Sequence, residues 1–245
     1  MRYTIQYLRS LAFVTQMYLA MAVFALLYTP MALASRPWAY RAVRHYALWV
    51  RWTARWMVGL RSEVRGTPPT DEVLIASKHQ SFFDIIILVS VVPRPRFIMK
   101  KSLKWAPVLG WYAMRIGCVP VDRGKRGKAI AGMVEAVRNG RQAPGQLIIY
   151  PQGTRVAPGA HRPYKVGAGI LYQQFGHDCV PAATNVGVFW PRTGIYRKPG
   201  LAVVEFLPQI PAGMPVDGFM DTLEQRVETA SDRLMDEAGF RQGRP

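Results

Sequence analysis

From residue 72 onward, short apolar segments typical of β-strands alternate with longer segments of helical periodicity, and this alternation constrains the fold more than any other feature. Strands are expected at residues 73–77, 96–99, 118–121, 146–150, 180–184 and 201–206. Helices are expected at residues 82–92, 102–116, 127–138, 166–175 and 215–237. The alternation predicts an α/β fold, in which a mainly parallel sheet is flanked by helices and functional residues follow the strands.

Residues 1–62 differ from the rest of the chain, because they contain eight arginines, no lysine and no acidic residue. Residues 11–28 are almost entirely apolar, and a helix of that length reaches roughly 27 Å, which is marginal for crossing a bilayer. A second helix over residues 38–60 would carry arginines on one face and apolar side chains on the adjoining face: Arg41, Arg44, Arg51 and Arg55, then Trp38, Trp49, Trp52, Trp56 and Leu60. Tryptophan favours the headgroup level of a membrane and arginine favours anionic lipid. We therefore expect a membrane-docking two-helix motif at residues 1–62 and an α/β domain at residues 63–245.

Two other interpretations of the N-terminal segment stay open. Arg2 and Arg9 precede the apolar residues, and Ala32-Leu33-Ala34 fits a cleavage site, as in a signal peptide. The same periodicity also fits an ordinary pair of core helices.

The composition predicts a folded protein with an anionic partner, since the net charge is +17 while half of the residues are apolar. The two cysteines, Cys118 and Cys179, are too few for a disulfide framework or a thiolate zinc site. A nucleic-acid-binding protein would also be basic, but no recognised nucleic-acid motif is present, so no nucleic-acid partner is expected. A membrane-anchored structural protein is a further alternative, and in such a protein the polar residues described next would be dispensable.

His79 is the one histidine of four that follows a strongly predicted strand and precedes a helix, and Asp84 comes five residues later. A carboxylate one turn into a helix can fold back onto such an imidazole, fix its tautomer and stabilise the imidazolium. The pair would act on a substrate hydroxyl directly, because no Gly-x-Ser-x-Gly elbow supplies a nucleophile. An aspartate that only caps the helix beside a structural histidine is the alternative.

Other polar segments also follow predicted strands. Residues 150–155, Tyr-Pro-Gln-Gly-Thr-Arg, offer a hydroxyl group and a guanidinium fork suited to a phosphate. Residues 100–110 read Lys-x-x-Leu-x-x-x-Pro-x-x-Gly and begin with basic side chains. Residues 180–185, Val-Pro-x-x-x-Asn, suit a core strand better than a site, and the basic residues 124–128 predict a surface turn, because they lack the spacing of a phosphate-binding loop.

Four motifs occur in this order along the chain: His-x4-Asp at 79–84, then the motifs at 100–110, 150–155 and 180–185. Together they resemble the glycerophospholipid acyltransferase family over about residues 72–210. The resemblance implies that His79 deprotonates a glycerol hydroxyl that attacks an acyl thioester, and that Asp84 supports it. It also implies that Arg155, helped by Lys100, binds the acceptor phosphate in a pocket shaped by Gly153 and Thr154. The family usually has glutamate where this chain has Gln152, and glutamine keeps the size of the side chain but lacks its charge. Because the resemblance implies that this position binds substrate, the change concerns which acceptor is used more than which reaction is catalysed.

The reaction implied by the resemblance moves an acyl chain from acyl-CoA or acyl carrier protein to the sn-2 hydroxyl of 1-acyl-glycerol-3-phosphate, forming phosphatidic acid. Another lyso-lipid, such as a lyso-ornithine lipid, is the alternative acceptor. Backbone N–H groups at the start of the helix after His79 are expected to hold the oxyanion, and neither a metal nor a cofactor is expected. The enzyme would bind membrane lipids at the cytoplasmic face of the inner membrane, where its thioester donors are found.

Overall fold

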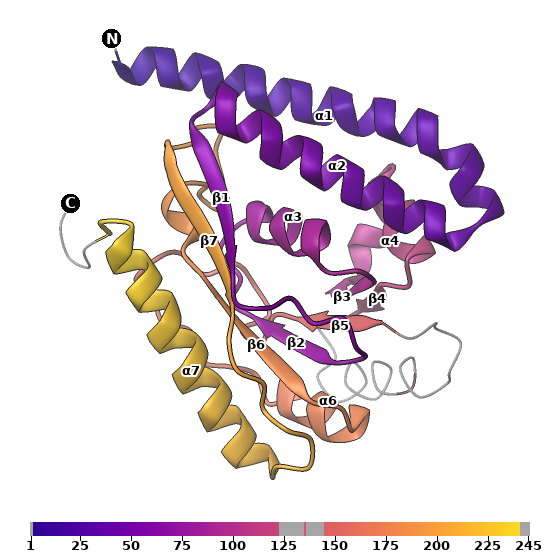
Figure 1. The fold of residues 1–245 in the computed structure, drawn as a ribbon, viewed down its shortest axis with the longest axis vertical. Coiled ribbons are helices and arrows are strands. Elements are labelled where there is room, and N and C mark those ends of the chain that lie inside the picture. Colours follow the sequence, from indigo (N-terminus) through magenta and orange to yellow (C-terminus); the bar gives the residue numbers. More distant parts are fainter. Residues whose placement is uncertain (1, 123–134, 136–144, 241–245) are drawn as a thin grey trace.

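The computed structural model describes residues 2–122, 135 and 145–240. In this part of the chain seven strands form one sheet in the order β1-β7-β6-β2-β5-β3-β4 (Figure 1). The strands are β1 (Leu60–Arg65), β2 (Leu74–Ser77), β3 (Pro95–Lys100), β4 (Val119–Val121), β5 (Gln146–Ile149), β6 (Cys179–Thr184) and β7 (Gly200–Phe206). All neighbouring strands are parallel except β6 and β7, which are antiparallel. The predicted mainly parallel sheet is confirmed.

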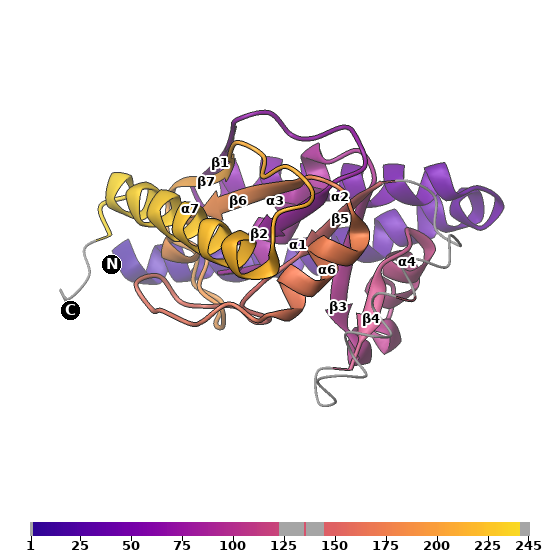
Figure 2. The ribbon, with the colours of Figure 1, turned by 90° about the horizontal axis from the view of Figure 1, so that it is seen from below.

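Helices cover both faces of the sheet (Figures 1 and 2). One face is covered by α1 (Arg2–Ala34), α2 (Arg36–Met57), α3 (Phe82–Val91) and α4 (Leu109–Arg115), and the other by α6 (Gly167–Phe175) and α7 (Val216–Glu237). Two short 3-10 helices, η1 (Lys101–Trp105) and η2 (Val186–Val188), complete the described elements. The helix expected at residues 127–138 and the basic turn at 124–128 lie outside the described residues.

The helix expected at residues 102–116 is divided in two, η1 and α4, because the chain turns sharply between them. Pro107 lacks a backbone N–H, and Val108 adopts φ 60° and ψ −65°, values close to a γ-turn. Gly110 allows the two helices to approach closely, since a Cβ atom there would lie 2.4 Å from the Lys104 carbonyl oxygen. The glycine of this motif is therefore required by packing.

The domain boundary expected between residues 62 and 63 falls inside β1, a strand that was not predicted from the sequence. β1 pairs in parallel with β7, so that Leu60 lies beside Gly200, and Leu60 is a buried strand residue instead of part of a helix. In addition, α1 and α2 share one hydrophobic core with α3 and with a face of the sheet. Residues 2–62 thus share a hydrophobic core and a sheet strand with the rest of the described chain.

The first helix, α1, is 33 residues long and continues through Pro30, beyond the apolar segment at residues 11–28. Residues Tyr3–Ala34 are long and apolar enough to cross a membrane by length and composition, and only 17% of the most apolar window is buried. Even so, Phe13 and Met17 lie in the protein core, and the Gln6 side chain donates a hydrogen bond to the carbonyl oxygen of Arg197. These contacts favour a permanent helix of the fold over a cleaved signal peptide.

The second helix, α2, has two different faces. Its inner face is buried and consists mainly of small residues: Ala39, Ala42, Ala47, Val50, Thr53 and Ala54. Its outer face exposes Trp49, Trp52 and Trp56. Two of the four arginines expected on one face of this helix make contacts within the protein: Arg51 donates to the hydroxyl groups of Ser62 and Ser90, and Arg44 donates to the Ser90 carbonyl oxygen. These hydrogen bonds connect α2 to β1 through Ser62 and to α3 through Ser90.

Candidate active site

His79 and Asp84 meet at the turn between β2 and α3. The His79 Nδ1 atom lies 2.9 Å from Oδ1 of Asp84, whose side chain is fully buried. The other carboxylate oxygen accepts hydrogen bonds from the backbone N–H groups of Gln80 and Ser81, both at 2.8 Å, and Ser81 is the N-cap residue of α3. Asp84 therefore both caps the helix and holds the imidazole, so the two interpretations of this residue are compatible.

Tyr150, the residue after β5, completes the surroundings of the histidine. Its ring stacks on the His79 ring, with the centroids 3.9 Å apart, and its hydroxyl donates to Asp84 Oδ1 at 3.3 Å. Burial, together with the Asp84 charge, raises the pKa of Tyr150 well above its usual value, so it stays a donor. Because an ionised Asp84 accepts from Nδ1–H, the unprotonated ring nitrogen is Nε2. The side chain of His79 is 13% exposed, which leaves this nitrogen for a substrate proton.

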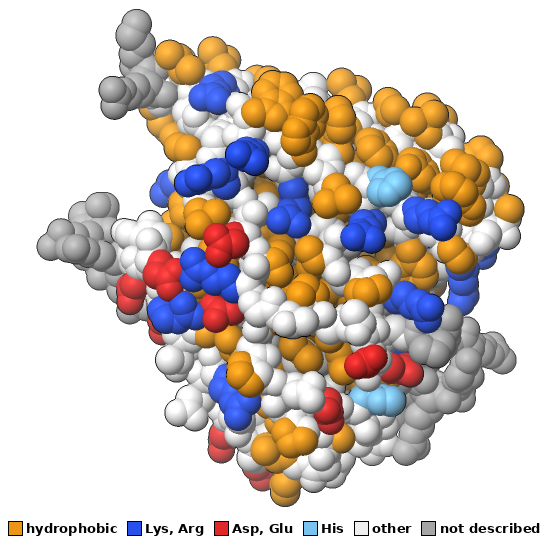
Figure 3. All heavy atoms as spheres, viewed as in Figure 1, with side chains coloured by type: hydrophobic (Ala, Val, Ile, Leu, Met, Phe, Trp, Pro, Cys, Tyr) orange, Lys and Arg blue, Asp and Glu red, His pale blue; other side chains and the backbone are white. Residues whose placement is uncertain are grey.

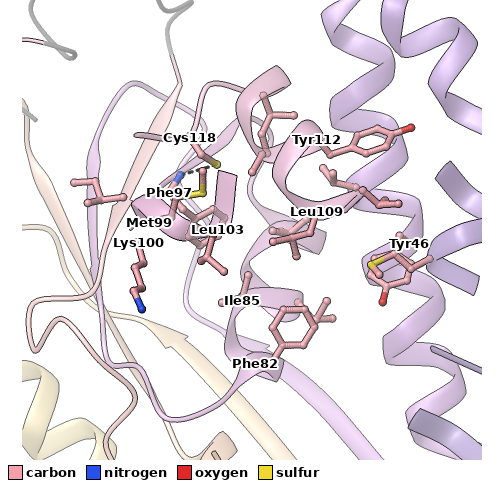
Figure 4. Close-up of a pocket in the computed structure, with 18 of the residues that line it drawn as sticks. Tyr46, Phe82, Ile85, Phe97, Met99, Lys100, Leu103, Leu109, Tyr112 and Cys118 are labelled. Carbon is pink, nitrogen blue, oxygen red and sulfur yellow. Dashed lines mark hydrogen bonds between the residues drawn. The ribbon is translucent and has the colours of Figure 1, made fainter. Parts of the chain in front are cut away.

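His79 lines a cavity of about 480 Å³ that runs between the helices on this face of the sheet. Apolar side chains from α2, α3 and the β3–α4 segment point into the space, with Lys100 at its edge (Figure 4). The helix α1 adds Met21, Phe24 and Ala25. A largely apolar cavity of this size, with a few polar groups at one place, is typical of a small-molecule site.

Three cationic side chains line the same cavity as His79: Lys100, Arg155 and Arg192. The Arg155 guanidinium donates to the carbonyl oxygen of Arg192 at 2.9 Å, which joins the loop after β5 to the loop after β6. Thr154 is also part of the lining. Lys100, Thr154 and Arg155 were predicted as site residues and Arg192 was not, although Pro191, Gly194 and Pro199 mark its segment as a loop.

Gln152 does not line the cavity, in contrast to the direct substrate contact that was expected. Its buried side chain points the other way and donates to the Arg162 carbonyl oxygen at 3.1 Å and to Glu228 of α7 at 3.4 Å. Gly153 is likewise absent from the lining and has a φ of 70°, which favours glycine. A Cβ atom at Gly153 would lie 2.9 Å from the Lys165 ammonium nitrogen. Gln152 and Gly153 therefore stabilise the conformation of the loop that carries Thr154 and Arg155.

Three backbone N–H groups around the start of α3, where the oxyanion was expected to bind, already donate hydrogen bonds within the protein. Asp84 accepts from Gln80 and Ser81, and the Ser81 hydroxyl accepts from the Phe83 N–H. The amides of residues 80, 81 and 83 hence stabilise the turn. The expected oxyanion role is not supported for these three groups.

Cys118 is the cysteine that lines the cavity. Burial raises the pKa of this thiol to about 11, so it remains protonated at neutral pH and is a poor nucleophile. Its sulfur instead accepts a hydrogen bond from the Phe97 N–H. Among residues 2–122, 135 and 145–240, no group of three His, Cys, Asp or Glu side chains is placed to bind a metal ion.

The fold and the site together define a class of α/β proteins that place a histidine–aspartate pair beside an apolar cavity with a cationic edge. Residues 61–185 match the family described as Acyltransferase, and the chain belongs to this family. The resemblance found in the four motifs is confirmed.

Individual relatives agree with the family. A 1-acyl-sn-glycerol-3-phosphate acyltransferase from Pseudomonas aeruginosa is 26% identical over 197 residues, which cover 80% of this chain and 77% of that protein. The corresponding alpha enzyme from Mus musculus is 30% identical over 163 residues, which cover 64% of this chain and 57% of that protein. The crystal structure of a 1-acyl-sn-glycerophosphate (LPA) acyltransferase from Thermotoga maritima has the same fold, with a TM-score of 0.79, 16% sequence identity, and coverage of 96% of this chain and 99% of that one.

Proposed function

We propose that this enzyme transfers an acyl chain from a thioester, acyl-CoA or acyl carrier protein, to the sn-2 hydroxyl of 1-acylglycerol-3-phosphate and so forms phosphatidic acid. The observation that carries the proposal is the position of His79 at one apolar cavity together with Lys100, Arg155 and Arg192. The base suits a hydroxyl, the apolar walls suit an acyl chain, and the cations suit a phosphate. The relatives named above carry the name of this reaction.

In the proposed reaction, Nε2 of His79 takes the proton from the acceptor hydroxyl while the hydroxyl oxygen attacks the thioester carbonyl carbon. Asp84, 2.9 Å from Nδ1, stabilises the imidazolium that forms. When the tetrahedral intermediate collapses, the carbon–sulfur bond breaks and the imidazolium returns the proton to the departing thiolate. The products are the new ester and a free thiol, and the histidine is ready for the next cycle.

Recognition of the acceptor is assigned to the cations at the edge of the cavity. Arg155 presents a planar fork that matches phosphate geometry, while Lys100 and Arg192 add positive charge from two other segments. The acyl donors are polyanionic too, and the net charge of +17 favours their approach. Thr154 lies in the same lining and offers a hydroxyl to either substrate.

The outer surface of α1 and α2 supports membrane association. Hydrophobic side chains line this side of the molecule, Lys and Arg side chains lie beneath them, and acidic side chains lie farther away (Figure 3). The exposed tryptophans of α2 suit the headgroup level of a bilayer. This arrangement would hold the cavity, which α1 and α2 help to line, close to lipid substrates. We propose the cytoplasmic face of the inner membrane as its location, because the thioester donors are made in the cytoplasm.

We expect replacement of Trp52 and Trp56 by alanine to weaken binding to vesicles that contain anionic phospholipid. These side chains are 54% and 56% exposed, and inserting that much apolar surface into the interface contributes on the order of a tenfold gain in partitioning for each tryptophan. The measurement is co-sedimentation with phosphatidylglycerol vesicles, with thermal unfolding as a check of the fold. Unchanged partitioning of a folded variant would argue against docking through α2.

The proposed reaction is tested by incubating purified enzyme in mixed micelles with a panel of lyso-lipids and either acyl-CoA or acyl carrier protein thioesters. We expect lysophosphatidate to be acylated with the highest kcat/KM and free thiol to appear in equal amount. A higher kcat/KM for a lyso-ornithine lipid would instead assign a different acceptor to the same chemistry. If no lyso-lipid is acylated with either donor, the proposal is wrong.

A further inference from the structure

An ion pair between a buried lysine and a partly buried glutamate lies on the far side of the active-site loops and connects them to α7. Lys78, directly before His79, is only 2% exposed, and its ammonium group lies 2.5 Å from the Glu228 carboxylate. The mechanism proposed above does not use either residue. A buried lysine needs a compensating charge, because desolvation strongly disfavours an isolated ammonium group.

Glu228 also binds the loop that carries Thr154 and Arg155, at both of its ends. At the start of this loop, Gln152 donates to Glu228 Oε1 at 3.4 Å, and near its end the Tyr164 hydroxyl donates to the same oxygen at 2.8 Å. Burial and the Glu228 charge raise the pKa of Tyr164 far above its usual value, so this hydroxyl remains a donor. One carboxylate thus joins the turn before α3 to the loop after β5.

The two joined segments carry the groups that face the substrate. His79 lies on the first, and its carbonyl oxygen accepts a hydrogen bond from the Val156 N–H of the second at 2.8 Å. The rings of His79 and Tyr150 stack across the same junction. A shift of one segment relative to the other would therefore move the base relative to Arg155.

The hydrogen-bond partners of Gln152 suit an amide and do not suit a carboxylate, because both of them are acceptors. A glutamate there would put an oxygen about 3.4 Å from Glu228 Oε1, where the Gln152 N–H group now donates. It would also face the Arg162 carbonyl oxygen, which cannot donate a hydrogen bond. A second carboxylate, Asp232, already shares these surroundings: burial and the Glu228 charge raise its pKa, and the Lys78 ammonium group opposes that shift.

We propose that Glu228 is a positioning residue for acyl transfer, which holds the His79 and Arg155 segments in register, and that Gln152 is neutral because Glu228 already supplies the carboxylate that pairs with Lys78 and accepts from Gln152. On this view the departure from the family's usual glutamate at position 152 is compensated from α7. It does not specify a different acceptor. The inference rests on the proposed function for its kinetic readout, but thermal unfolding tests it independently of activity.

The test is a set of full-length variants: Gln152→Glu, Glu228→Gln, the double variant Gln152→Glu/Glu228→Gln, and Asp221→Asn as a control. The control removes a charge from an exposed position of the same helix. In the double variant one carboxylate remains, with the two side chains exchanged, so the amide at position 228 can donate to the new glutamate while its oxygen faces Lys78. We expect each single variant to lose about tenfold or more in kcat/KM and to unfold at lower temperature.

The double variant is expected to recover most of the loss in both measurements relative to Gln152→Glu, and the Asp221→Asn control to match the parent chain. If positions 152 and 228 stabilised the fold independently of each other, their losses would add in the double variant. Additive losses would overturn the proposal. Wild-type rate and stability in Gln152→Glu alone would overturn it as well. If the parent enzyme acylates no lyso-lipid, the proposed function fails, while the pattern of unfolding temperatures still decides whether the two positions are coupled.

Discussion

Replacement of His79 by alanine is expected to lower kcat for acyl transfer by about 10² to 10⁴-fold, because the general base is lost. The fold should survive, since the histidine is at the cavity surface and Asp84 keeps three donors, the N–H groups of Gln80 and Ser81 and the Tyr150 hydroxyl. The measurement is the single-turnover rate of thiol release with lysophosphatidate as acceptor.

A matched control for this substitution is His161→Ala, which removes an imidazole that is 71% exposed and contacts Glu224 at 3.1 Å. The control should keep the parent rate. Retention of more than about a tenth of the parent rate by a folded His79→Ala variant would show that another group removes the proton.

Replacement of Arg155 by alanine is expected to reduce kcat/KM for a phosphate-bearing acceptor by roughly 10 to 150-fold, the equivalent of one charge-assisted hydrogen bond. The loss for the thioester donor should be much smaller. Arg155→Lys should recover only part of the acceptor efficiency, because an ammonium group cannot reproduce the two-pronged fork. The measurement is kcat/KM for each substrate with the other held at saturation.

The control for Arg155 is Arg162→Ala, which removes the same charge from an exposed position of the same loop. Only the backbone of Arg162 binds Gln152, so that contact is kept. Because Arg155 also binds the Arg192 carbonyl oxygen, its loss can loosen the loop after β6. Equal losses for donor and acceptor would then identify Arg155 as a structural residue of that loop.

Features set by neighbours along the chain could be predicted from the sequence. The strands β2, β5 and β6 are short, buried and bounded by turn residues, so their apolar runs identify them directly. His79 and Asp84 meet because the turn and the first turn of α3 form over only six residues, and such a local arrangement is encoded in the spacing.

The strand β1 could not be predicted from the sequence for a physical reason. It is an edge strand with only Leu60 fully buried, and its remaining residues are polar or partly exposed. Its apolar signal is therefore weak, although its pairing with β7 runs through the whole strand. The weak signal of β1 also explains why the sequence predicts a boundary after residue 62, since helical periodicity indicates that one face of a helix is buried without showing what covers it.

The sequence by itself determined the alternation of strands and helices, the histidine–aspartate pair and the basic segments after the strands, because each depends on residues within a few positions of one another. Only the tertiary structure decided that Arg192 joins Arg155 at the cavity and that Gln152 turns away from it toward α7. These contacts bring together segments separated by 37 and 76 residues. They depend on how helices pack on the two faces of the sheet, and that packing is fixed by the whole hydrophobic core instead of any single motif.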